Sequence, residues 1–192
     1  MGVSLAKGGR VSLSKEAPGL KKIKVGLGWD ANATDTGAQF DLDASAFLVG
    51  TDGKVVNDAH FIFYNNATSP CGAIVHEGDN RTGEGDGDDE VIAIDLDKVS
   101  SDIEKIIVTV TIDEAVARNQ NFGQVNNSVI RIVNQDGGTE IVKYELDEDY
   151  SSETAINFGE LYRKDGNWSF KAVGAGFNDG LSGFCKTYGV SL

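Results

Sequence analysis

The chain has 192 residues, of which 40% are hydrophobic and 24% charged, and its formal net charge at pH 7 is −13. This length suffices for one well-cored domain, which we expect to cover residues 1–192. The acidic excess argues against direct binding of nucleic acid or of anionic membrane surfaces, because both select basic patches. It favours the binding of cations.

The two cysteines, Cys71 and Cys185, are too few and too far apart for a disulfide framework. The first twenty residues lack the apolar core of a secretory signal, and no segment reaches transmembrane length. We therefore expect a cytoplasmic protein. A peripheral association with a membrane complex stays open.

Alternating apolar residues predict a strand between Val11 and Trp29, with Ile23, Val25 and Leu27 on one side. An acidic stretch follows, and no Lys or Arg occurs between residues 24 and 54. Its acids are Asp30, Asp35, Asp41 and Asp43.

Asp41 and Asp43 are separated by a single residue, Leu42. In an extended chain the two carboxylates point to one face, and Leu42 points to the other. Two carboxylates on one face form half of a cation site.

A second acidic stretch lies between Glu77 and Glu90, where seven acids accompany one base, Arg81. Like charges this close repel, and four interspersed glycines add backbone freedom that is costly to restrict. Calcium would relieve the repulsion, since it takes roughly 6–8 oxygen ligands from carboxylates, amides and backbone carbonyls.

Other interpretations of this second stretch agree less well with its residues. A solvated acidic loop is common, but the apolar strand predicted over 91–96 places these acids at a strand entrance. A phosphate-binding loop would offer amides and a lysine instead of carboxylates. The spacing does not match an EF-hand, which requires an oxygen ligand where Arg81 stands and a glycine where Glu84 stands.

Asp-Gly pairs at 52–53, 136–137 and 165–166 lie between apolar runs and predict hairpins. Strand patterns also cover 44–50, 60–66, 104–112, 129–133, 141–146, 156–162 and 168–173. Helix signals are confined to 113–118 and 181–188, the latter ending before Gly189. The predicted fold is all-β: an antiparallel β-sandwich with two short helices, whose end loops bring the two acidic stretches together.

The chain closely resembles the TerD family of bacterial tellurium-resistance proteins over essentially its whole length. The motifs that carry the resemblance are GWDANATDTGAQFDLDAS, FIFYNN, HEGDNRTGEGDGDDE, FGQVNN, IRIVNQDGG and ETAINFGELYR. The resemblance implies a β-sandwich that binds two adjacent calcium ions. It also implies a role in resistance to tellurite, some phages and pore-forming colicins, with no reaction mechanism attached.

The family's metal motif falls on two sets of residues in this chain. In the first stretch the resemblance implies Asp30, Asp41, Asp43 and the carbonyl of Leu42 as ligands. In the second it implies Asp79, Asn80, the carbonyls of Thr82 and Gly83, Asp86, Asp88, Asp89 and Glu90.

Three functional hypotheses remain. The leading one is a non-enzymatic, calcium-dependent interaction module whose partners are other proteins of the resistance system, in the cytoplasm or at a membrane complex. The second is a metal-dependent hydrolase using pairs such as Asp41 with Asp43 or Asp88 with Glu90. The third is thiol chemistry on tellurite, for which one loop cysteine without a neighbouring cysteine is a poor basis.

Overall fold

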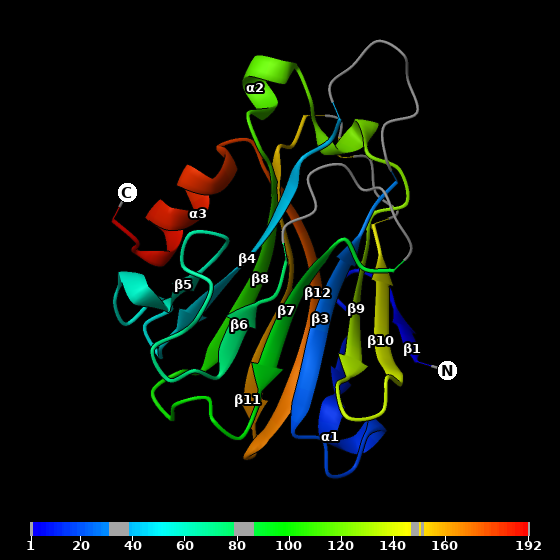
Figure 1. The fold of residues 1–192 in the computed structure, drawn as a ribbon, viewed down its shortest axis with the longest axis vertical. Coiled ribbons are helices and arrows are strands. Elements are labelled where there is room, and N and C mark those ends of the chain that lie inside the picture. Colours follow the sequence, from blue (N-terminus) through cyan, green and yellow to red (C-terminus); the bar gives the residue numbers. More distant parts are fainter. Residues whose placement is uncertain (1, 31–38, 79–86, 147–149, 151, 192) are drawn as a thin grey trace.

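The computed structural model describes residues 2–30, 39–78, 87–146, 150 and 152–191. Within them the strands form two sheets of six that pack face to face (Figure 1). The first, called the β3 sheet, runs in the order β1 (Val3–Leu5), β10 (Glu140–Glu145), β9 (Val129–Asn134), β3 (Lys22–Gly28), β7 (Glu90–Asp95) and β6 (Ile74–His76). The second, called the β8 sheet, runs β2 (Arg10–Ser12), β12 (Asn167–Phe177), β11 (Ala155–Lys164), β8 (Lys105–Ile112), β4 (Leu42–Val49) and β5 (Phe61–Ile62). The expected sandwich is confirmed.

Alternation along the strands builds the core between the sheets. In β3, Ile23, Val25 and Leu27 are at most 3% exposed, whereas Lys22 and Lys24 face outward. The β9–β10 and β11–β12 hairpins form around the predicted Asp-Gly turns. Period-two patterning was sufficient here because each of these strands has one apolar face and one face that carries polar residues.

Helix α3 (Gly180–Tyr188) covers part of the outer face of the β8 sheet, as Figure 1 shows. Phe184 and Cys185 of α3 pack on Phe47 of β4 and Ile107 of β8, in a second apolar cluster. Gly189 ends the helix at a φ of +79°, a conformation that favours glycine. The predicted terminal helix and its terminator are confirmed, and α2 (Ala115–Arg118) forms inside the predicted 113–118 segment.

The strand expected between Val11 and Trp29 was wrong in its first half. Within the described residues there is a third α-helix, α1 (Leu13–Glu16), beside the 3-10 helices η1 (Asp58–His60) and η2 (Phe122–Gln124). The chain must change sheets here, because β2 belongs to the β8 sheet and β3 to the β3 sheet. Helix α1 makes that crossing and buries Leu13 completely.

Three other expectations need correction. The hairpin predicted after β4 contributes a single bridge, between Val49 and Val55, because the Val55 amide donates to the carbonyl of Tyr188 at the end of α3 (2.9 Å). The strand expected from residue 60 to 66 reduces to β5 (Phe61–Ile62). The sandwich is also not wholly antiparallel, since β1 pairs with β10 in parallel.

Candidate metal centre

The two acidic stretches meet at one end of the sandwich. The Trp29 amide donates to Asp89 Oδ2 at 2.9 Å, and the Ala44 amide donates to Glu90 Oε2. Figure 1 shows the end of β3 and the starts of β4 and β7 at this same end. The residues that flank 30–43 on either side therefore contact the end of the second stretch.

Glu90 links the two sheets from inside. It is 1% exposed, opposes Leu27 in register and shares the inner face of β7 with Ile92 and Ile94. Its carboxylate reaches the backbone of β4 in the other sheet, and His76 Nε2 lies 3.5 Å from its Oε2. These contacts offset part of the free-energy cost of burying the carboxylate.

Asp88 and Asp89 directly precede β7, and their side chains point in different directions. Asp89 donates its amide to the Leu27 carbonyl (2.8 Å) and so extends the β3–β7 ladder beyond the start of β7. Asp88 lies over the outer face of the β3 sheet, where its Oδ1 is 2.6 Å from Arg131 Nε. The hydrogen bond to Asp88 raises the pKa of the Arg131 guanidinium. Gly26 leaves room for this pair, since a Cβ there would lie 2.1 Å from Asp88 Oδ2.

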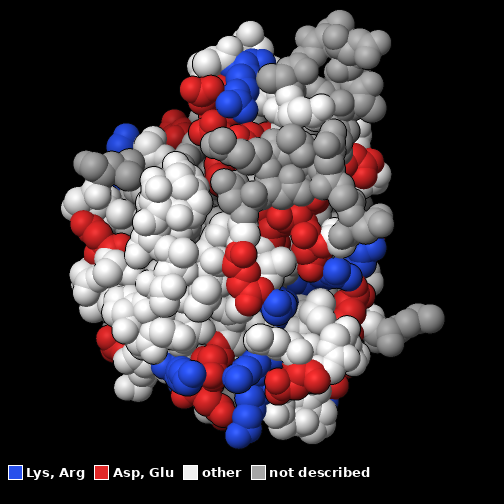
Figure 2. All heavy atoms as spheres, in the orientation of Figure 1, with Lys and Arg blue, Asp and Glu red and all other residues white. Residues whose placement is uncertain are grey.

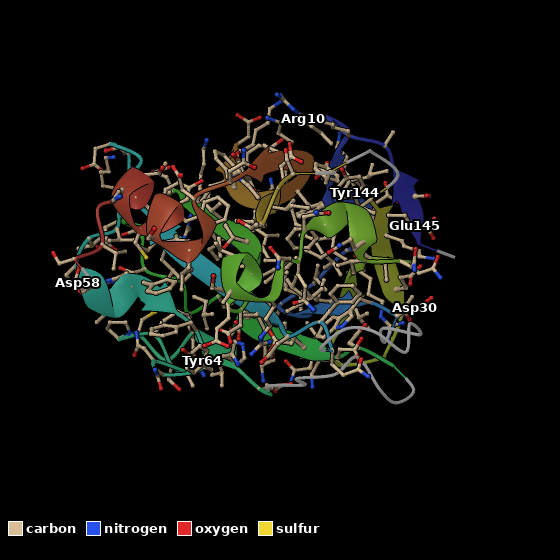
Figure 3. The ribbon with its side chains drawn as sticks, turned by 90° about the horizontal axis from the view of Figure 1, so that it is seen from above. Arg10, Asp30, Asp58, Tyr64, Tyr144 and Glu145 are labelled. Carbon is tan, nitrogen blue, oxygen red and sulfur yellow. The ribbon has the colours of Figure 1, made fainter. Side chains whose placement is uncertain are left out.

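Asp30 is held by the segment that precedes β9. Its Oδ2 accepts a hydrogen bond from Asn127 Nδ2 at 2.6 Å, and its amide donates to the Asn126 carbonyl at 3.0 Å. Figure 3 shows Asp30 at the edge of the molecule seen from this end. Asp30 and Asp89 are therefore anchored by different partners around Trp29.

Asp41 and Asp43 lie on one face of the chain and Leu42 on the other, as predicted. Leu42 is fully buried in the core. The Asp41 carbonyl accepts from the Asp113 amide at 2.8 Å, and the Asp41 carboxylate is 4.0 Å from Arg118 Nη1. The two carboxylates thus belong to the outer side of the β8 sheet, near α2.

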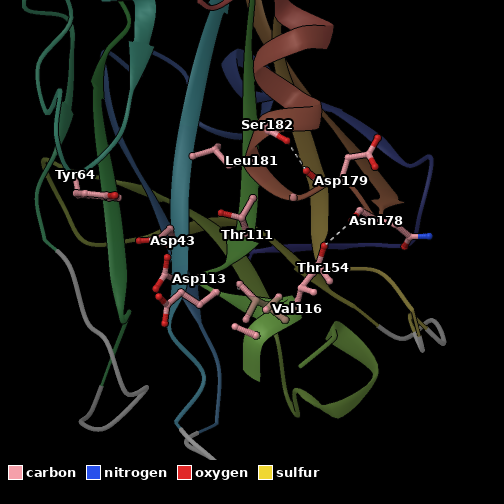
Figure 4. A pocket seen from close by; sticks show the side chains of 15 residues that line it. Asp43, Tyr64, Thr111, Asp113, Val116, Thr154, Asn178, Asp179, Leu181 and Ser182 are labelled. Carbon is pink, nitrogen blue, oxygen red and sulfur yellow. Dashed lines mark hydrogen bonds between the residues drawn. The ribbon is translucent and has the colours of Figure 1, made fainter. Parts of the chain in front are cut away.

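Asp43 lines a cavity of about 470 Å³ between α2 and α3 (Figure 4). Asp43 and Asp113 lie next to each other in this cavity, and Leu181 of α3 lies across from them. Tyr64 and Val116, also in the lining, are 50% and 83% exposed. The cavity therefore combines carboxylates with exposed apolar side chains.

The donor set of this end is all oxygen, which suits calcium and not zinc, since zinc prefers Cys and His. Acidic side chains gather beside the undescribed region in Figure 2. Among the described residues, however, no three His, Cys, Asp or Glu side chains form a group that could hold a metal ion. The other predicted ligands, Asp79, Asn80, Thr82, Gly83 and Asp86, lie outside the described residues.

The cysteines and His60 lie away from this end. Cys185 is buried and Cys71 is exposed. Burial opposes ionisation of the Cys71 thiol, but hydrogen bonds from Ser69 and nearby backbone groups outweigh it, and the pKa is lowered. His60 Nδ1 lies 3.0 Å from Asn57 Oδ1, a local structural contact.

Several residues that shape the site were missed in the sequence. Arg131, Asn127 and Arg118 hold predicted carboxylates, and Gly26 makes space for one of them. A glycine inside a strand pattern is a recognised sign of close approach, so Gly26 could have been noticed. The three polar partners are distant in sequence from the acids they contact and gave no local signal.

The sequence profile of the TerD domain matches residues 1–188. A tellurium resistance protein TerD of Serratia marcescens is 59% identical over 191 residues, covering 100% of this chain and 99% of the relative. General stress protein 16U of Bacillus subtilis is 50% identical over 192 residues, covering 100% of both chains. The crystal structure of a homologue of the telluride resistance protein from Streptomyces coelicolor superposes with a TM-score of 0.71 at 27% identity, covering 86% of this chain and 95% of the other.

None of the described helices is long and apolar enough to cross a membrane.

Proposed function

The chain belongs to the TerD family of tellurium-resistance and stress-response proteins, and we propose that it is a calcium-binding interaction module and not an enzyme. One observation carries the proposal. The amides of Trp29 and Ala44 bind Asp89 and Glu90, which holds the ends of two oxygen-rich stretches together at one end of the sandwich.

In this proposal two calcium ions bind at that end. Among the described residues, Asp30, Asp41, Asp43, Asp88, Asp89 and Glu90 and the Leu42 carbonyl would contribute oxygens, beside the predicted ligands of 79–86. Bound calcium would supply positive charge that offsets the repulsion among these carboxylates. Part of the binding free energy would then order the acidic stretches.

The partner surface in the proposal is the cavity between α2 and α3. Asp43 belongs both to the proposed ligand set and to this cavity, so calcium at Asp43 would change the charge that a partner meets. Tyr64 and Val116 supply exposed apolar area beside it. The expected partners are other proteins of a tellurite-resistance system, in the cytoplasm or at the periphery of a membrane complex. We expect no direct binding of nucleic acid.

Calorimetric titration of the metal-free protein tests calcium binding. We expect calcium to bind more tightly than magnesium or zinc, and Asp41→Ala and Asp88→Ala each to weaken both binding events. Asp136→Ala, an equal charge change in the β9–β10 turn, is the matched control and should leave both unchanged. Tighter zinc binding, or loss of one event alone in each variant, would contradict the shared oxygen site.

The interaction role needs a separate test. Partners copurified with the full chain in calcium and in chelator would be compared, using Tyr64→Ala and Val116→Ser variants with the exposed Val56→Ser as control. We expect calcium-dependent partners that the first two variants lose. A calcium-independent set, or equal loss in the Val56 control, would count against this surface.

Of the two pairs named for the hydrolase alternative, Asp88 with Glu90 does not converge on one point. Glu90 is buried against Ala44, and Asp88 is bound to Arg131 on the outer face of the β3 sheet. These two carboxylates thus face opposite sides of that sheet. A metal-dependent hydrolytic activity of the purified protein that falls in both Asp41→Ala and Asp88→Ala would revive this alternative.

A further inference from the structure

A second cavity, of about 310 Å³, opens on the outer face of the β8 sheet where β2, β12 and β11 lie side by side. Its volume is near the lower end of the usual range for small-molecule sites, about 300–1,000 Å³. Arg10, Lys15 and Lys164 contribute positive charge to its wall, and Ser12, Tyr162 and Ser169 contribute hydroxyl groups. Neither the proposed calcium site nor its partner surface uses any of these residues.

The hydroxyl groups form a row across three strands. Ser169 of β12 is paired in register with Ser12 of β2 on one side and with Tyr162 of β11 on the other. Directly paired residues share a face of the sheet. The neighbours of Ser169, Trp168 and Phe170, pack in the core, so this row faces outward into the cavity.

Ser169 is only 5% exposed, and Ser12 and Tyr162 flank it in the row. The Ser169 hydroxyl lines the cavity. It is therefore placed to bind a ligand.

The three cations make no ion pair with any described residue. This is unexpected in a chain in which 30 acids outnumber 17 bases. Only Asp165 adds negative charge to the lining, so three bases stand against one acid. A local excess of two positive charges persists on an otherwise acidic protein.

We propose that this cavity binds the phosphate group of a phosphate-bearing ligand. A phosphate monoester carries about −1.5 to −2 charges at pH 7 and three acceptor oxygens, which match the excess charge and the row of donors. Arg10 would bind two oxygens through its planar guanidinium, and the lysines would act as point charges. Figure 3 shows Arg10 at the margin of the molecule, away from Asp30, so the two sites are separate.

Titration of the full chain with inorganic phosphate in calcium-free buffer at constant ionic strength, followed by amide NMR shifts, tests the proposal. We expect saturable shifts centred on Ser12, Lys164 and Ser169. Arg10→Gln and Lys164→Gln should each weaken binding about threefold to fivefold, the size expected for exposed charge pairs. Lys186→Gln is the matched control, because it removes one equally exposed, unpaired charge from α3.

Ser169→Ala separates a built site from a diffuse positive patch, since it removes a donor without changing charge. We expect it to weaken phosphate binding at least threefold. Vesicles of phosphatidylcholine with and without phosphatidic acid identify the source of the phosphate group. Lys164-dependent binding of the phosphatidic acid vesicles assigns a lipid. Binding of inorganic phosphate alone assigns a soluble ligand. No saturable binding in either arm, unaltered binding by Ser169→Ala, or equal weakening by Lys186→Gln would overturn the proposal.

Discussion

Asp88 Oδ1 lies 2.6 Å from Arg131 Nε, and the pair occupies the space that Gly26 leaves open on the outer face of the β3 sheet. The pair joins the entrance of β7 to β9, across β3. The Asp88 side chain is 14% exposed and that of Arg131 36%, so solvent screens the attraction only in part. One proposed calcium ligand is thus paired with an arginine from another strand.

Gly26→Ala should displace Asp88 and break its pair with Arg131. A Cβ at 2.1 Å from a carboxylate oxygen cannot be accommodated without movement, whereas at Gly28 the nearest atom would be 3.5 Å away. We expect Gly26→Ala to lower the free energy of unfolding by about 1–3 kcal/mol and to weaken calcium binding. Gly28→Ala, on the same strand and face, is the control and should do neither, by urea unfolding and calorimetry. Equal behaviour of the two variants would contradict the close approach.

Arg131→Gln should destabilise the calcium-free protein and increase its stabilisation by calcium. Removing the guanidinium leaves the Asp88 carboxylate without its counter-charge, which destabilises the calcium-free protein. It also removes a cation that competes with calcium for this carboxylate. The measurement is the Tm in chelator and in calcium. Lys143→Gln removes another outward-facing base of this sheet, which pairs with Glu145 2.5 Å away, and should leave the calcium increment unchanged. A smaller increment in Arg131→Gln would mean that the arginine positions Asp88 for calcium.

Calcium removal should loosen the acidic end and spare most of the sandwich. Ligands that bind only the folded state add RT ln(1 + [L]/Kd), about 2.7 kcal/mol at a hundredfold excess over Kd. The β9–β10 and β11–β12 hairpins are paired along their lengths and have turns far in sequence from the acidic stretches. Amide exchange should therefore change most at 30–43 and 77–90. Equal loss of protection in the two hairpins would mean that calcium holds the whole domain together.

Alkaline pH should destabilise the packing of α3 through Tyr188. Burial, and then the charge of Glu160, raise the pKa of Tyr188 to about 12, while the hydrogen bond from Asn157 opposes the rise. The unfolded tyrosine ionises near pH 10, so this stability is present below about pH 10 and is lost as the pH rises toward 12.

The loss is at most about 1.4 kcal/mol per pH unit and less after solvent screening. Tyr188→Phe should flatten this dependence in urea unfolding between pH 9 and 11, values bracketing the ordinary tyrosine pKa. An unchanged slope would show that the phenol ionises freely in the folded state.

Much of the fold could be predicted because strands such as β3 and β10 have one apolar face and one face with polar residues. Ile23, Val25 and Leu27 illustrate this, and the Asp-Gly turns at 136–137 and 165–166 closed the expected hairpins. Helix α1 could not be predicted, because it forms where the chain crosses from one sheet to the other. That crossing is a property of the whole topology and leaves no local pattern.

The candidate site was predictable in its residues more than in its geometry. The spacing of Asp41 and Asp43 correctly assigned them to one face. It could not show that this face belongs to the outer side of the β8 sheet, where α2 and α3 enclose a cavity around Asp43. Arg131 was missed because its contact with Asp88 joins residues 43 positions apart.

The N-terminal segment closes the sandwich along one side. β1 completes the β3 sheet beside β10, and β2, a few residues later, completes the β8 sheet beside β12. Removing this segment would uncover two unpaired strand edges at once, and such edges recruit strands from other molecules. The first dozen residues thus cover one edge of each sheet. Chains shortened there should aggregate even where every residue of the acidic end is intact.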